Sequence, residues 1–260
     1  MKTKRLFSLE LERNSLQPYQ IAVVVSNFFI LGFIYLMATI PKIDPADSDA
    51  ELFGSYNFVI GLTFVVMMGI FSMISATMSS KFIVDEYRGK KAILLFSYPI
   101  SRKNVMKTKM LLVFLFTFVS MLISGTAILM VFMITESFVP ISKDSISLRL
   151  ILTSIIYLIG YALIASFCGI VSSWIGFKKK SVIATIVASC IIMVIMCQIA
   201  AMTFFAGAAM LLLLTGMGIV TFFAVKNMLD QVQKWRFSVT MAVSFSQKNG
   251  WPLDTHASVR

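Results

Sequence analysis

The side chains that most often perform chemistry are few in this sequence, and they form no catalytic set. The chain has three cysteines, Cys168, Cys190 and Cys197, and a single histidine, His256, near its end. The cysteines lie in apolar stretches without metal-ligand spacing, where a free thiol behaves as a small hydrophobic group. Neither a G-x-x-x-x-G-K-[ST] phosphate loop nor a G-x-S-x-G nucleophile motif occurs. We therefore expect no catalytic residue, no metal site and no bound cofactor in this chain, and no enzymatic activity of its own.

One strongly polar stretch, residues 85–102, interrupts an otherwise apolar chain with the sequence DEYRGKKAILLFSYPISR. The chain as a whole is 58% hydrophobic and only 13% charged, with a mean hydropathy of +0.87. Soluble domains usually have about 25% charged residues. The composition therefore predicts a membrane protein, and the polar stretch must lie outside the hydrocarbon.

The polar stretch has the pattern of a short helix. The carboxylates of Asp85 and Glu86 come early, where they interact favourably with the positive end of the helix dipole. Lys90 follows Glu86 at the i+4 spacing that supports a helix. Pro99 ends the element, because the residue before a proline is biased away from helical angles. We expect a helix over residues 84–98, with its apolar run AILLF available equally to lipid or to a second protein.

The apolar runs define the spans. A helix needs roughly 20 apolar residues to cross the bilayer. The longest uncharged run, residues 181–225, would be about 68 Å long as one helix, so it must fold into two spans with a turn near residues 200–207. We predict an all-α polytopic membrane protein with six transmembrane helices, at approximately 21–40, 57–80, 110–134, 150–176, 181–200 and 205–225.

The basic residues predict the orientation of these spans. Lys and Arg accumulate in cytoplasmic loops. With a cytosolic N-terminus, the inner segments hold 20 of the 23 basic residues. Both termini are therefore predicted to be cytosolic, in a multi-pass protein of a bacterial cell membrane. The net charge of +11 is explained by this asymmetry and by contact with membrane lipid, so we do not expect nucleic acid as a partner.

The predicted spans contain no Asp, Glu, Lys, Arg or His. Proton relays and ion-coupled transporters usually place such residues at membrane depth, so these mechanisms are disfavoured. The polar side chains in the spans are mild, and they include Asn27, Gln198 and many Ser and Thr. Interhelical hydrogen bonding is the simpler explanation for each, and a position along a substrate path is the alternative for Asn27 and Gln198.

The polar stretch resembles the type-2 permease family of ABC transporters in its ordered residues and in its place between spans two and three. The resemblance depends on an acidic residue, a glycine three positions later, a run of leucines, a P-x-S-R sequence and a lysine before a long span. The matching residues are Glu86, Gly89, Leu94, Leu95, Pro99, Ser101, Arg102 and Lys109. Lys90 stands where that family often has threonine.

The resemblance implies a membrane subunit that pairs with a second copy or with a related permease and recruits two copies of a separate ABC ATPase. ATP and Mg²⁺ would bind to that ATPase. The helix over 84–98 would be the coupling helix that docks on the ATPase through Asp85, Glu86, Gly89, Lys90, Leu94, Leu95, Pro99, Ser101 and Arg102. Residues 1–20 would form an interfacial elbow helix.

The expected function is that of a permease subunit of an ATP-driven exporter. The uncharged spans favour a hydrophobic or amphipathic substrate, such as a peptide, an antibiotic or a lipid, because a charged solute would find no counter-ion there. Two alternatives are a non-transport membrane scaffold or sensor and an ATP-independent channel. The tail over 226–260 is expected to be cytosolic and disordered, although FSVTMAVSFS alternates like a strand.

Overall fold

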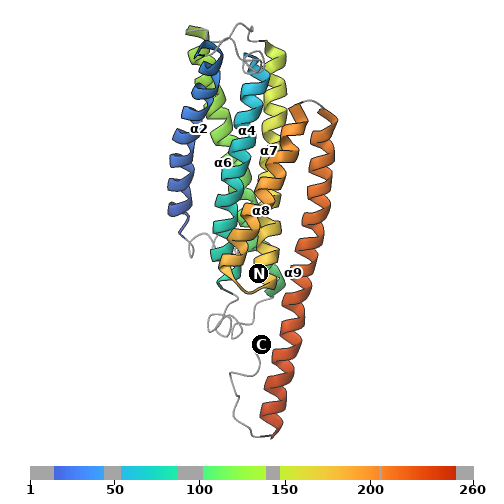
Figure 1. Cartoon of the computed structure of the whole chain (residues 1–260). Coiled ribbons are helices and arrows are strands. Elements are labelled where there is room, and N and C mark those ends of the chain that lie inside the picture. The colour runs from blue at the N-terminus through green and yellow to red at the C-terminus, as the bar shows by residue number, and fades with distance from the viewer. Residues whose placement is uncertain (1–14, 44–53, 87–101, 139–146, 205–206, 250–260) are drawn as a thin grey trace.

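A computed structural model describes residues 15–43, 54–86, 102–138, 147–204 and 207–249. Over these residues the chain is a bundle of long helices with no strand (Figure 1). The helices are α2 (Gln17–Ile43), α4 (Tyr56–Ser79), α6 (Arg102–Phe138), α7 (Leu148–Lys178), α8 (Val182–Ala201) and α9 (Gly207–Asn249). A π-helical turn, η1 (Ser80–Val84), continues α4, and a 3₁₀ turn, η2 (Met202–Phe204), follows α8. Six helices are long and apolar enough to cross a membrane, so over the described residues the prediction of an all-α fold with six candidate spans is confirmed.

Helices α4 and α7 form the centre of the bundle. Helix α4 packs against α2, α6, α7 and α8, whereas α7 packs against α4, α6, α8 and α9. The central core contains large buried side chains from both, including Phe64, Phe71 and Tyr161. Helices α2 and α8 are peripheral, with only 17% of their apolar windows buried against 61% for α4. Their exposed aliphatic and aromatic side chains are those expected of surfaces that face lipid.

The tight hairpin between α7 and α8 places the three lysines 178–180 at one end of the bundle. Lys180 has a left-handed φ of 51°, its N–H donates to the Phe177 carbonyl, and the Ser181 N–H donates to the Gly176 carbonyl. These two bonds are the pattern of a Schellman motif, which ends a helix. The Ser181 side chain then accepts from the Ala184 N–H at 3.3 Å and caps α8. The break between the fourth and fifth predicted spans therefore has a local cause.

The end of the bundle that contains these lysines also contains Lys81, Lys103, Lys107 and Lys226. We call it the basic end. Here α2, α6 and α8 begin, and α4 and α7 end, as the alternation of successive helices requires. Helix α9 continues past it, and Figure 1 shows the C-terminal part of α9 reaching beyond the other helices.

Helices α6 and α9 extend furthest beyond the spans that the sequence predicted. Helix α6 has 37 residues and α9 has 43, or about 56 and 65 Å at 1.5 Å per residue. Both exceed the roughly 30 Å of hydrocarbon. The expectation of a disordered tail from residue 226 is wrong as far as Asn249, because α9 is continuous to that residue. The predicted elbow falls mainly on residues 1–14, outside the described residues.

Helices α4 and α7 lie close together at Gly169. A Cβ built on Gly169 would lie 1.9 Å from Ser75 Oγ and 2.6 Å from Ser75 Cβ. Small residues allow helix backbones to approach closely in membranes. Gly169→Ala is therefore expected to force α4 and α7 apart and to destabilise the fold by about 1–3 kcal/mol, measured as a lower melting temperature in detergent. Gly216→Ala on α9 is the matched control, because nothing lies within 4 Å of the added methyl group. An equal loss in both variants would contradict the expectation.

Candidate functional site

The candidate site is a buried ion pair at the basic end of the bundle. The Lys109 ammonium, only 1% exposed, pairs with Glu86 Oε2. It also donates a hydrogen bond of 3.1 Å to the Phe82 carbonyl oxygen. Glu86 is partly exposed, at 14%, and it is the last described residue before the polar stretch continues. The pair therefore attaches the beginning of that stretch to the first turns of α6.

The π-helical turn η1 positions the two partners of Lys109. The regular helix α4 ends at Ser79, and Ser80–Val84 follow as a wider turn in which the Asp85 N–H donates to the Ser80 carbonyl at 2.9 Å. The last carbonyls of a helix lack intrahelical donors, and a lysine side chain can satisfy them. Lys109 does so at Phe82, where its charge also suits the negative end of the helix dipole. Single π turns of this kind recur at functional positions in helices.

An apolar cluster at the same end of the bundle as the ion pair joins four elements. We call it the basic-end cluster, and it consists of Ile83, Val84, Met106, Met110, Phe177, Met228, Leu229 and Val232. These residues come from η1, α6, α7 and α9. Because the cluster is packed, a displacement of η1 must move the start of α6 and the middle of α9 or open a cavity. The site can therefore transmit motion from η1 to α6 and α9.

The other residues of the predicted coupling site are placed only in part. Asp85 follows directly after η1 and is partly exposed, and Arg102 is the first residue of α6. Gly89, Lys90, Leu94, Leu95, Pro99 and Ser101 lie outside the described residues. Of the helix predicted over 84–98, the described residues include only the part up to Glu86. Within that part, Val84 belongs to the π turn η1. Its docking role stays a prediction.

Asn27 and Gln198 are not brought together. Asn27 lies on α2, which packs against α4 and α6, and Gln198 lies on α8, which packs against α4 and α7. Asn27 is half-buried, and its Oδ1 atom is buried without a hydrogen-bond partner among the described residues. Gln198 is exposed on the outer face of α8. The structure therefore gives no single path that both side chains line.

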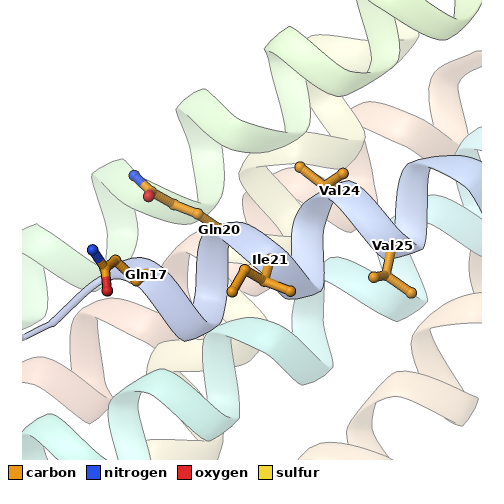
Figure 2. A pocket seen from close by; sticks show the side chains of 5 residues that line it. All are labelled: Gln17, Gln20, Ile21, Val24 and Val25. Carbon is orange, nitrogen blue, oxygen red and sulfur yellow. The ribbon is translucent and has the colours of Figure 1, made fainter.

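A shallow hollow on the outer surface of α2 lies at the basic end (Figure 2). It has a volume of about 340 Å³ and is lined by Gln17, Gln20, Ile21, Val24 and Val25. The two amides come first and the three aliphatic side chains follow toward the membrane interior, as Figure 2 shows. This order matches the polarity gradient of an amphiphile at a bilayer surface, with a polar head followed by an apolar chain.

A second buried polar contact lies at the opposite end of α6, and the sequence did not predict it. The Tyr56 hydroxyl donates to Glu136 Oε1 at 2.5 Å, and Glu136 is only 3% exposed. Next to it, Tyr35 and Thr135 share a hydrogen bond of 2.6 Å. The predicted span ends at residue 134, whereas α6 continues to Phe138 and contains Glu136. A signal was present, because Glu136 directly follows the apolar run.

Comparisons with known proteins give one informative relative. No family model matches this chain, and no solved structure matches it. The chain is 25% identical over 190 residues to the protein described as "Uncharacterized protein YcbO" of Bacillus subtilis (strain 168), a match that covers 73% of this chain and 82% of that protein. The similarity extends over most of both chains.

Proposed function

We propose that this chain is the membrane permease subunit of an ATP-driven exporter, a member of the type-2 permease family of ABC transporters. A separate ATPase would bind the polar stretch between α4 and α6 at the cytosolic face. Two permease subunits, identical or related, would form the pathway between them. The basic end of the bundle would then be cytosolic, in keeping with the excess of basic residues there.

The observation that best supports this proposal is the buried pair of Lys109 and Glu86. Both residues belong to the pattern that resembles the family, and they are in contact although 23 positions apart. A segment that receives force from another protein needs a firm connection to the helices that it moves. The ion pair and the basic-end cluster give the polar stretch such a connection to α6 and α9. Neither a passive scaffold nor an ATP-independent channel requires it.

The cargo that fits best is a hydrophobic or amphipathic molecule. The apolar spans offer few charged groups, since Lys109 and Glu136 lie near the two ends of α6 and are engaged with Glu86 and Tyr56. The hollow on α2 presents amides at the bilayer surface and aliphatic side chains below them. An amphiphile in the inner leaflet could therefore reach the protein from the side, and Asn27 lies two residues beyond Val25 on the same helix.

Transport is expected to require a partner ATPase. The purified chain, co-expressed with a candidate P-loop ATPase, would be reconstituted in vesicles with a fluorescent phospholipid and a labelled amphipathic peptide as probes. We expect ATP-dependent movement of one probe with both proteins, and none with the permease alone. A partner carrying a Walker-lysine substitution is the matched control. Movement of a probe by the permease alone would contradict the proposal and favour a channel. A partner that does not bind the permease, and whose ATPase activity is not stimulated, would contradict it and favour a scaffold.

A further inference from the structure

Four sulfur-containing side chains gather along the interface between α4 and α8. Cys190 Sγ lies 3.7 Å from Met73 Sδ. Met193 Sδ and Cys197 Sγ lie 3.4 and 3.5 Å from the position that a Cβ on Gly69 would occupy. We call Met73, Cys190, Met193 and Cys197 the sulfur row. From their apolar surroundings the cysteines are predicted to be packing residues, and the sequence alone does not place Met73 beside them.

The helical spacing explains why the sulfur atoms share one interface. Cys190, Met193 and Cys197 follow each other at i, i+3 and i+7, which places them on one face of α8. Gly69 and Met73 are one turn apart on the facing side of α4. Because Gly69 has no side chain, the thioether of Met193 and the thiol of Cys197 can approach the α4 backbone closely. The row therefore extends over about two helical turns.

Sulfur ligands select particular metals. Thiolate and thioether groups prefer soft cations such as Cu(I), whereas carboxylates and imidazoles suit harder ones. Among the described residues, no group of three or more His, Cys, Asp or Glu side chains could hold a metal ion. A zinc or magnesium site is therefore not indicated there. Two of the four members of the sulfur row, Met73 and Met193, are thioethers, which most metals bind poorly but Cu(I) binds well.

We propose that Met73 and Cys190 form a binding site for a soft monovalent cation, Cu(I) or its chemical analogue Ag(I), with Met193 as a third sulfur ligand. As the metal–sulfur bond forms, the Cys190 thiol releases its proton to water, so one thiolate and one monovalent cation make a neutral site. Neutrality matters at this depth, because an unpaired charge in the bilayer is costly. Methionine has three rotatable bonds, so the Met193 sulfur can move toward the metal without a backbone change.

The site can be reached from outside the bundle. Cys190 is exposed on the surface of the chain, whereas its ligand partner Met73 is half-buried. Cys190 is eight residues from the start of α8, or about 12 Å from the basic end. A soft cation that enters along α8 from the basic end would meet the exposed thiol of Cys190 first and then the half-buried thioether of Met73. The inference is independent of the proposed export function.

Binding of Cu(I) by the purified full chain tests this site. In anaerobic detergent solution, with bicinchoninate as competing chelator, we expect one Cu(I) per wild-type chain and a sulfur-only first shell by X-ray absorption. Met73→Leu and Cys190→Ser are each expected to weaken binding at least tenfold. Met130→Leu is the matched control, since Met130 is 60% exposed on α6. Cys190→Met, which keeps a sulfur atom at this position, should bind Cu(I) more tightly than Cys190→Ser.

Two results would overturn the inference. The first is a wild-type chain that takes no Cu(I) from bicinchoninate, which would leave the sulfur row as packing. The second is equal binding by the wild type, Met73→Leu and Cys190→Ser, which would place the metal elsewhere. Monodisperse elution and an unchanged melting temperature show that each variant is folded. Because the readout needs neither ATP nor a partner, it is separate from the test of export.

Discussion

Lys109→Met is expected to destabilise the bundle by about 3–5 kcal/mol, the cost of leaving one member of a buried ion pair without its partner. Methionine nearly matches the length of the lysine chain, so the change removes the charge and the hydrogen bond to Phe82 while it preserves most of the packing. In a chain of this size, such a loss corresponds to a fall of roughly 10 °C in melting temperature. The melting temperature is measured by heating the protein in detergent and monitoring the loss of folded protein by size-exclusion chromatography.

A double-mutant cycle separates the ion pair from other effects of the substitution. Lys109→Met combined with Glu86→Gln should be more stable than Lys109→Met alone, because the uncompensated carboxylate is gone. Lys107→Met is the matched control, since Lys107 is exposed two residues earlier on α6 and its loss should stay within about 0.5 kcal/mol. Strictly additive effects of the two substitutions would show that the pair does not stabilise the fold.

The number and type of the helices could be predicted because the bilayer imposes a simple constraint. Backbone groups in hydrocarbon must bond within a helix, so each apolar run of sufficient length becomes one. The break at lysines 178–180 was visible as charge, and the turn predicted near 200–207 agrees with η2 and the start of α9 at Gly207. These features depend only on local composition.

The helix ends could not be predicted, because the bilayer constraint stops where water begins. Outside the hydrocarbon, helices continue as long as local propensity and packing favour them. Met228, Leu229 and Val232 show this for α9, since they are buried in the basic-end cluster in a region that the sequence assigned to a disordered tail. The alternating pattern of residues 237–246 was also compatible with a strand, although α9 is helical there.

The candidate site was only half accessible to sequence reasoning. Glu86 and Lys109 were recognised as members of one motif, yet spacing alone could not show that they touch, because their contact depends on how η1 ends α4. Tyr56 and Glu136 are 80 residues apart, and no pattern joins them. Contacts between helices arise from packing geometry, so a single sequence contains little signal for them.

The ion pair also changes which substitution can test coupling. Glu86→Ala would disturb the fold and the proposed docking surface together, so its loss of activity would be ambiguous. Leu94 and Leu95 offer a cleaner test, because the resemblance places both on the docking surface. If the side chains of Leu94 and Leu95 are buried in a partner ATPase, Leu94→Ser and Leu95→Ser should each reduce the free energy of binding to it by about 1.5–3 kcal/mol. We expect binding to the ATPase to weaken by roughly 10²- to 10⁴-fold, and ATP-dependent transport to be lost.

The binding constant of the purified partner and its ATPase stimulation measure this effect, with the melting temperature of the permease alone as a reference. Leu148→Ser is the matched control, because Leu148 is 73% exposed at the opposite end of the bundle and has no place in the docking surface. A double variant that melts like the wild type but no longer binds the ATPase would assign the apolar run to docking. If it binds and transports normally, the run contacts lipid instead, and force from the ATPase must enter the bundle by another route.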